Sequence, residues 1–298
     1  MPKAKVNGIN IAYDVSGQGE PLVLIMSNED SRQGWFFQKR PFGKYFKVVT
    51  FDSRGAGRSD KPDEPYKMKT LADDTVGLMN HLGIDKAHIL GVSEGGIVAQ
   101  EVAINYPERV NKLVLVSTTH GSEDEMTPEM QKILGVTEHF SGNGMLMAGM
   151  SQCPVCHGNY QKKELWEHQW AAHRDWMVEW AKGIDFYRMV SDSFNKRLYR
   201  MFILPLGWLF IKLGGTERYV KHLEVGIGNI TLDRLHLIKA PTLVIIGTKD
   251  KLVPLHSSEV MTEKIPNAKL VKFEGGSHTL TIEMRGRFNK EVLDFLRA

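Results

Sequence analysis

The sequence predicts an α/β fold, in which a mostly parallel, doubly wound sheet carries helices on both faces and is interrupted by an inserted helical cap. Short apolar runs alternate with helical periodicity up to about residue 119 and again from about residue 233. Between residues 120 and 232 the strand signals stop, and five of the six tryptophans fall there. We therefore expect a core built from 1–119 and 233–298, with a cap at 120–232.

The individual elements follow from local patterns taken in chain order. Asn7-Gly8 is a hairpin signal between two short strands within residues 6–15. The spacing of apolar residues predicts a helix over 71–82, which ends before Gly83. A second helix with an apolar stripe is predicted over 97–103. Continuous apolar runs predict buried strands at 21–26, 47–51, 86–90, 112–116 and 241–246.

Composition sets limits on the class of protein. The chain has 298 residues, of which 42% are hydrophobic and 24% charged, as is usual for globular proteins. A net charge of +3 is too small to predict nucleic acid as the main partner. The first residues lack an apolar signal core, and the longest apolar run, 201–213, is too short to span a bilayer. We expect a cytoplasmic protein with no membrane span.

Three residues in matching contexts point to nucleophilic chemistry. Ser93 lies in Gly-Val-Ser-Glu-Gly between a predicted strand and a predicted helix, a setting that holds a serine in a tight, exposed turn. A serine hydroxyl needs a base to take its proton and an acid to orient that base. Asp250 follows the 241–246 strand, and His278 ends Gly-Gly-Ser-His. The order Ser, Asp, His therefore predicts a catalytic triad.

The motifs resemble the α/β-hydrolase superfamily, and its branch of enol-lactonases, cofactor-free haloperoxidases and methyl esterases in particular. Residues 51–59 are similar to the D-x-R-G-x-G-x-S turn of that family. The resemblance extends to 103–110, to the acid-bearing strand at 241–250 and to the histidine loop at 275–278. It implies that Ser93 is the nucleophile, that His278 is the base and acid, and that Asp250 orients the histidine.

The resemblance also implies an oxyanion hole made from two backbone N–H groups. One belongs to Glu94, and by position the other belongs to Asn28. Relatives carry His-Gly where this chain has Met-Ser-Asn-Glu-Asp at 26–30. Because one missing oxyanion donor costs about 3–4 kcal/mol of transition-state stabilisation, this departure separates a good esterase from a poor one.

Each of these residues also has a purely structural interpretation. Asp250 is suited to capping a helix that starts near Pro254. Arg54 is expected to tie loops together, and His120 either lines the pocket or is a surface or hydrogen-bonded histidine. The side chain of Glu94 can be solvated, and in that case only its backbone N–H takes part in the site.

The cap contains a second motif, C-x2-C-x11-H-x4-H. Its four candidate ligands are Cys153, Cys156, His168 and His173, a set that matches the tetrahedral preference of zinc. Tyr160 and Leu165 stand where C2H2 zinc fingers keep an aromatic residue and a leucine, so residues 153–173 resemble such a finger. We expect a structural Zn²⁺ and no cofactor for catalysis. A c-type haem motif ending at His157, or a chance arrangement of free thiols, is the alternative.

Together these patterns favour a serine hydrolase that cleaves a carboxylic ester or lactone with apolar groups through an acyl-enzyme. Hydrolysis of C–C bonds and perhydrolysis use the same triad and stay open. A ligand-binding protein with little or no turnover on a hydrolase scaffold is the alternative of another class. The expected partner is a small ester or lactone, with no nucleic acid. The 201–213 run is a candidate dimer face or interfacial lid in the cap.

Overall fold

The structure is a computed structural model, and it describes residues 2–27, 32–64, 66–121, 229–250 and 252–298. These residues form an eight-stranded sheet with the order β1-β2-β4-β3-β5-β6-β7-β8. The strands are β1 (Lys3–Val6), β2 (Ile9–Ser16), β3 (Glu20–Ile25), β4 (Phe46–Phe51), β5 (Ala87–Val92), β6 (Val110–Val116), β7 (Thr242–Gly247) and β8 (Ala268–Phe273). The pairs from β4 to β8 are parallel, and only β1 and β2 join antiparallel.

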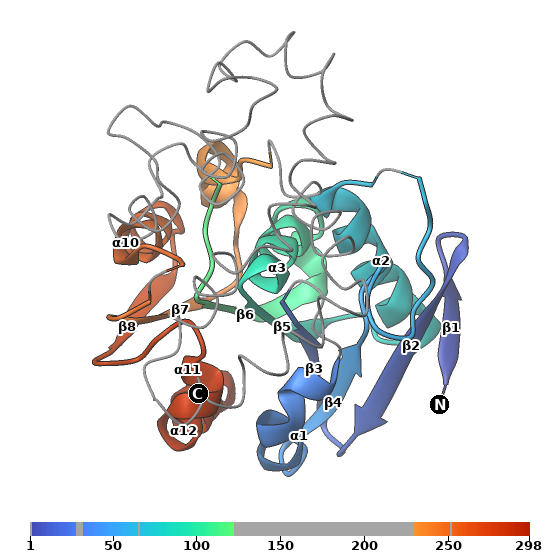
Figure 1. Ribbon diagram of the computed structural model, residues 1–298, viewed down its shortest axis with the longest axis horizontal. Helices are drawn as coiled ribbons and strands as arrows, with labels where there is room; N and C mark the ends of the chain where they lie inside the picture. Colours follow the sequence, from blue (N-terminus) through green and yellow to red (C-terminus); the bar gives the residue numbers. More distant parts are fainter. Residues whose placement is uncertain (1, 28–31, 65, 122–228, 251) are drawn as a thin grey trace, which may run out of the picture.

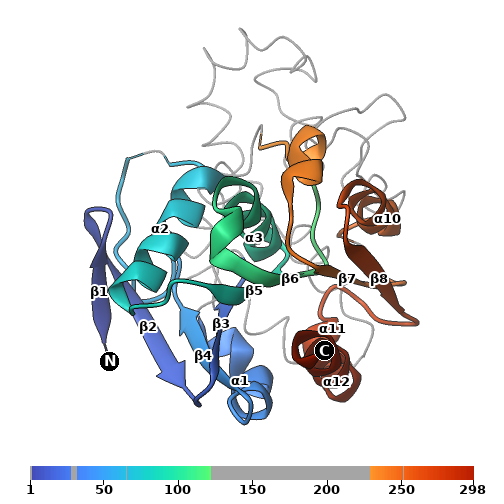
Figure 2. The ribbon, with the colours of Figure 1, turned by 180° about the vertical axis from the view of Figure 1, so that it is seen from behind.

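Helices cover both faces of this sheet, as Figures 1 and 2 show from opposite sides. One face carries α1 (Phe36–Phe42), α11 (Leu280–Glu283) and α12 (Arg285–Arg297). The other carries α2 (Met68–His81), α3 (Glu94–Asn105) and α10 (Leu255–Lys264). Three short 3-10 turns complete the described part: η1 (Arg32–Trp35), η2 (Pro107–Arg109) and η3 (Leu232–Leu237).

Alternation along each strand divides the interior into two hydrophobic clusters. In β3, Leu22 and Leu24 join the cluster under α1 and α12, while Val23 and Ile25 join the cluster under α2 and α3. Successive side chains of a strand point to opposite faces, so a strand that is buried on both sides has an unbroken apolar sequence. This explains why the central strands were recognisable from continuous apolar runs.

The antiparallel edge of the sheet begins with the predicted hairpin. Asn7 and Gly8 both have positive φ, 46° and 83°, as a two-residue type I′ turn requires. The turn brings Val6 opposite Ile9, and β2 then pairs with β4. Asn-Gly is suited to this geometry because both residues tolerate left-handed backbone angles better than most.

The predicted elements are present, with ends that differ by a few residues. The predicted strand at 21–26 is β3, which starts one residue earlier because Glu20 is in register with Phe46. The helix predicted over 71–82 is α2, which starts at Met68, where the Thr70 hydroxyl accepts a hydrogen bond from the Lys67 N–H. The α/β fold with a mostly parallel, doubly wound sheet is thus confirmed.

The predicted cap at 120–232 lies almost wholly outside the described residues. The described residues at its two ends lie together, because the backbone N–H of Thr231 donates to the His120 carbonyl at 2.9 Å. The Thr231 hydroxyl also donates to Gln100 Oε1 at 2.6 Å, which ties the returning chain to α3. The described chain therefore stops at residue 121 and resumes at residue 229 at neighbouring positions beside α3. Among the described residues, no helix is long and apolar enough to cross a bilayer.

Candidate active site

Ser93 lies in a strained turn between the end of β5 and the start of α3. Its φ of 53° and ψ of −124° lie outside the regions that most residues adopt. Its N–H donates to the Val116 carbonyl at 2.9 Å, and its carbonyl accepts the Thr118 hydroxyl at 2.7 Å. Both partners belong to β6 or the loop after it, so hydrogen bonds to the neighbouring strand stabilise the strained backbone conformation of Ser93.

Glycines flank this turn because neighbouring backbone leaves no room for a side chain. A Cβ at Gly91 would collide with the Gly95 carbonyl. A Cβ at Gly95 would collide with the carbonyls of Ile25 and Met26 at the end of β3. The glycines of the Gly-x-Ser-x-Gly motif therefore allow β3, β5 and α3 to meet at one point.

His278 connects Ser93 with Asp250. Its Nε2 lies 3.2 Å from Ser93 Oγ, and its Nδ1 lies 2.9 Å from Asp250 Oδ2. The Asp250 side chain is 1% exposed and that of His278 is 15% exposed. A carboxylate accepts a hydrogen bond, so Nδ1 carries the proton and Nε2 is left to accept from the serine hydroxyl. The three predicted residues therefore form one continuous hydrogen-bonded chain.

Asp250 does not cap α10, whose N-cap is Pro254 without a side-chain cap bond, but it holds the turn that precedes this helix. Its Oδ1 accepts the backbone N–H groups of Leu252 at 2.9 Å and Val253 at 3.0 Å, in the turn before α10. These bonds fix the carboxylate, and Oδ2 then faces His278. His278 Nδ1 is nearest to Oδ2, but it also lies 3.2 Å from Oδ1, so Oδ1 serves both the turn and the histidine.

A second carboxylate, which no sequence pattern predicted, supports the histidine loop. Glu283 in α11 accepts the Ser277 hydroxyl at 2.7 Å and the Ser277 N–H at 3.2 Å. Ser277 is fully buried and immediately precedes His278. No spacing rule points to this pair. The only signal is an acidic residue five positions after the histidine.

The predicted oxyanion hole is only partly within the described residues. Glu94 is the first residue of α3, so its N–H is one of the donors at a helix N-terminus that lack a partner within the helix. Asn28 lies outside the described residues.

The chain resumes at Arg32, whose N–H and Nη1 donate to Asp52 at 2.8 and 2.6 Å. Asp52 also accepts the Arg58 N–H at 2.9 Å, and this explains why the 51–59 motif begins with an aspartate.

Arg54 and His120 are both buried. Arg54 makes two bonds to Asp74, at 2.7 and 2.8 Å, and joins the 51–59 turn to α2, as expected. His120 is 2% exposed, so it is not a surface histidine. Burial and the nearby His256 lower its pKa to about 4, so it is neutral at neutral pH.

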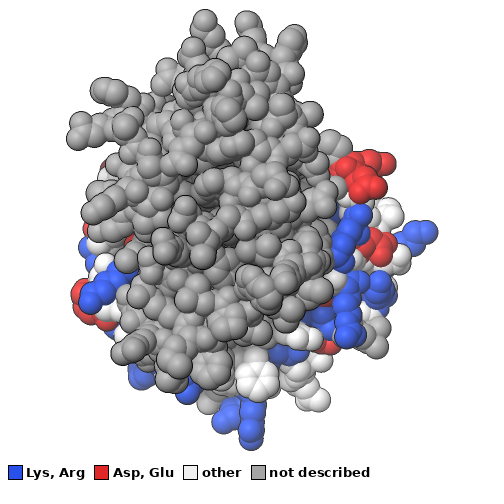
Figure 3. Space-filling model, viewed as in Figure 1, with Lys and Arg blue, Asp and Glu red and all other residues white. Residues whose placement is uncertain are grey.

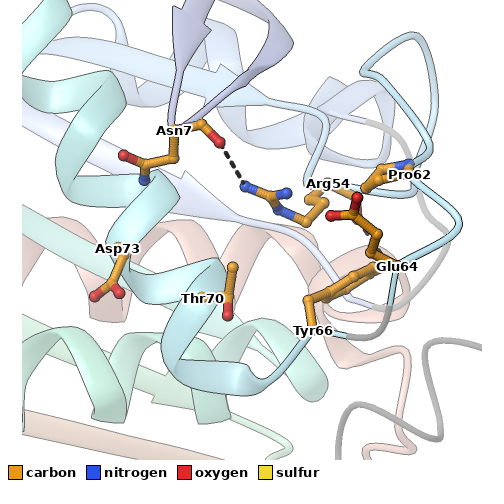
Figure 4. Close-up of a pocket in the computed structure, with 7 residues that line it drawn as sticks. All are labelled: Asn7, Arg54, Pro62, Glu64, Tyr66, Thr70 and Asp73. Carbon is orange, nitrogen blue, oxygen red and sulfur yellow. Dashed lines mark hydrogen bonds between the residues drawn. The ribbon is translucent and has the colours of Figure 1, made fainter.

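A cavity among the described residues lies away from the triad. It has a volume of about 310 Å³, and Figure 4 shows Arg54 and Glu64 pointing into it beside Tyr66. None of Ser93, Asp250 and His278 lines it. Its polar lining and the internal Arg54–Asp74 pairing fit a surface recess beside a structural ion pair.

The zinc prediction falls on residues that the structure does not describe. Cys153, Cys156, His168 and His173 all lie within 122–228. Within the described ranges, no group of three or more His, Cys, Asp or Glu side chains is placed to hold a metal ion. The zinc-finger resemblance therefore stays a prediction from sequence.

Comparisons with known proteins find relatives over nearly the whole chain. The family model for the alpha/beta hydrolase fold matches residues 20–142 and 156–283, and Cys153 lies in the gap between the two matched ranges. The chain is 23% identical over 295 residues to a putative carbamate hydrolase, RutD, of Azorhizobium caulinodans, covering 99% of this chain and 98% of the relative. It is 27% identical over 310 residues to a 2-hydroxy-6-oxononadienedioate/2-hydroxy-6-oxononatrienedioate hydrolase of Burkholderia vietnamiensis, covering 97% and 91%.

A solved structure shows the same fold. The enol-lactonase from Burkholderia xenovorans LB400 has a TM-score of 0.69 and 24% sequence identity, and the match covers 100% of both chains. The family match spans well over half of this chain, including the turn at Ser93, the strand before Asp250 and the loop at His278. The chain belongs to the alpha/beta hydrolase fold family.

Proposed function

We propose that the protein is a serine hydrolase that cleaves a carboxylic ester or lactone with apolar groups through an acyl-enzyme intermediate. The observation that carries this proposal is the hydrogen-bonded chain from Ser93 Oγ through His278 to Asp250. A buried carboxylate, a histidine of fixed tautomer and a serine in a strained turn are the three parts that nucleophilic acyl transfer needs.

In the proposed mechanism, Ser93 Oγ attacks the carbonyl carbon while His278 Nε2 takes its proton. The Asp250 carboxylate stabilises the imidazolium that forms. The Glu94 N–H, with that of Asn28 as the second donor, would bind the oxyanion. His278 then gives its proton to the leaving alcohol, and a water molecule releases the acid from Ser93 by the same steps.

The names of the relatives leave the scissile bond open. A carbamate hydrolase and a hydrolase of an oxo-dienedioate are both similar to this chain. The same serine, histidine and aspartate serve an ester, a carbamate or a carbon–carbon bond next to a ketone. An ester or lactone is our first proposal because apolar residues are abundant in 122–228, for example at 145–147 and 202–204.

Labelling with a fluorophosphonate, read by intact mass, tests the proposal. We expect one adduct per chain on the native wild type and none on Ser93→Ala or on unfolded wild type, because only an activated serine reacts. Turnover of a panel of esters, lactones, carbamates and 1,5-diketones should fall by several powers of ten in Ser93→Ala. Failure of the folded wild type to react, with a ligand bound equally by both proteins, would instead identify a binding protein.

A further inference from the structure

The surface made by α1 and α12 is much more basic than the rest of the chain. We define the basic face as the side chains of residues 36–45 and 285–297. These segments contain two acidic residues, Glu291 and Asp294, and seven basic ones: Lys39, Arg40, Lys44, Arg285, Arg287, Lys290 and Arg297. Their net side-chain charge is therefore +5, although the whole chain has only +3. Figure 3 shows Lys and Arg along the lower margin, where Figure 1 places these helices.

The two helices form one continuous surface. Asn289 of α12 donates to the Phe37 carbonyl of α1 at 3.1 Å, and Gln38 donates to the Asn289 side chain at 3.3 Å. Both ribbon views place the helices side by side on the same side of the sheet (Figures 1 and 2). Charges on α1 and α12 therefore act on the same partner.

Much of the positive charge on this face is not neutralised by neighbours. Lys39, Arg287 and Lys290 pair with Asp14, Glu291 and Asp294 at 3.1, 3.9 and 2.6 Å. The remaining four basic residues have no carboxylate within ion-pair distance among the described residues: Arg40, Lys44, Arg285 and Arg297.

Aromatic side chains are exposed among these charges. Phe36 is 75% exposed, Tyr45 44% and Phe37 37%. The guanidinium groups of Arg285 and Arg297 lie 5.0 and 4.3 Å from the ring centroids of Phe37 and Tyr45. Half of the six large hydrophobic residues that are exposed in the described part of the chain thus fall within ten residues. An aromatic residue beside basic ones is the usual composition of a surface that lies in the headgroup region of a membrane.

The basic face begins at the same edge of the sheet as the triad. Helix α1 follows the carboxyl end of β3, and α12 follows the loop that carries His278. The first residues of the two helices, Phe36 and Arg285, therefore mark the end of the face nearest the proposed active site. From there the face extends to the opposite edge of the sheet, where Lys44 and Tyr45 precede β4.

We propose that the basic face binds an anionic lipid surface, with Phe36 entering the headgroup region. Single-stranded nucleic acid fits less well, because base stacking requires open ring faces and the arginines already cover one face of Phe37 and Tyr45. The lipid-binding proposal does not depend on turnover.

Flotation with vesicles tests the proposal on the full chain. We expect binding to phosphatidylcholine vesicles that contain 30% phosphatidylserine, weakening as salt rises, and none to phosphatidylcholine alone. Arg40→Glu combined with Lys44→Glu should weaken binding at least about 30-fold, since each basic residue near such a surface is worth about fivefold in affinity. The matched control, Lys86→Glu with Lys264→Glu, has the same charge change at exposed positions off this face and should retain binding.

Phe36→Ser separates insertion from simple charge attraction. It leaves the charge unchanged and should weaken binding to the same vesicles, with fluorophosphonate labelling of Ser93 preserved. Three results would each overturn the proposal: no vesicle binding by the folded wild type, equal loss in the control pair, or equal binding to both kinds of vesicle. Binding of a single-stranded oligonucleotide in preference to the anionic vesicles would assign the face to nucleic acid instead.

Discussion

At the scale of single residues, the hydrogen bonds around His278 extend beyond the triad. Asp250 holds the ring at Nδ1, while Glu283 holds the backbone through the buried Ser277. A histidine that must accept a proton from Ser93 and return it needs both its ring plane and its backbone fixed. Glu283 is thus a positioning residue, because it holds Ser277, the residue that precedes the histidine.

We predict that Glu283→Ala lowers kcat for an ester about 10- to 100-fold with little change in KM, the size of effect expected when a catalytic group is misplaced by about 1 Å. Glu283→Gln should recover most of the activity, because an amide oxygen still accepts from Ser277. The measurement is steady-state kinetics together with the rate of fluorophosphonate labelling.

Glu274→Ala is the matched control for Glu283→Ala. Glu274 is an exposed carboxylate on the same loop, and it accepts the Thr248 hydroxyl at 3.3 Å, away from His278. Its loss should leave kcat unchanged. Equal losses in Glu274→Ala and Glu283→Ala would mean that the loop responds to any change, and the positioning role would be wrong.

At the scale of elements, an ion pair fastens the chain where it returns to the core after residue 228. Arg234 in η3 makes two bonds to Glu101 of α3, at 3.0 and 2.5 Å, and the Glu101 side chain is 3% exposed. Burial raises the pKa of Glu101, but hydrogen bonds and charge from Arg234 outweigh this and lower it overall. The carboxylate is therefore ionised inside the protein and depends on its partner.

We predict that Arg234→Ala lowers the free energy of unfolding by about 3 kcal/mol, since it leaves a buried charge unpaired. Adding Glu101→Gln should restore more than half of this loss, because the neutral amide needs no counter-charge. Urea unfolding of the two single variants and the double variant measures the coupling. If the loss of unfolding free energy in the double variant equals the sum of the two single losses, the pair contributes nothing beyond its separate contacts.

The zinc prediction also concerns an element, the 153–173 segment. If the four predicted ligands bind metal, purified protein should contain about one zinc per chain, because two thiolates and two imidazoles complete a tetrahedral site. Cys153→Ser with Cys156→Ser should remove it, and fluorophosphonate labelling of Ser93 should persist, since a closed site takes no part in the chemistry. Metal-free native protein with both thiols freely titratable would contradict the prediction.

At the scale of the whole molecule, the sequence predicts those elements that have a regular apolar pattern and those residues that belong to a motif. The central strands were predictable because burial on both faces leaves a continuous apolar run, as at 21–26. Helix α1 was not predicted, because it is only seven residues long and contains Pro41. Ser93, Asp250 and His278 could be assigned from context, whereas Glu283 could not, since its role depends on a side-chain contact with Ser277 that leaves no periodic signal.

Stability against acid is a property of the whole chain to which two buried histidines, His88 and His120, contribute. Burial lowers the pKa of His88, with Glu20 opposing it, and burial lowers the pKa of His120 to about 4. As pH falls below about 6.5, the unfolded chain takes up protons at these histidines and the folded chain does not. Both groups therefore stabilise the fold fully above pH 6.5 and lose that contribution as the pH falls.

We predict that the free energy of unfolding falls between pH 6.5 and 4, with about 3 kcal/mol of the loss due to His120 alone, at about 1.4 kcal/mol per pKa unit. Below about pH 4.5, protonation of Glu101 should add a further loss, because its pKa is lowered in the folded state. Urea unfolding across this range, for wild type, His120→Gln and the exposed control His236→Gln, measures the effect. The slope should flatten only in His120→Gln, and three parallel curves would show that His120 does not titrate with unfolding.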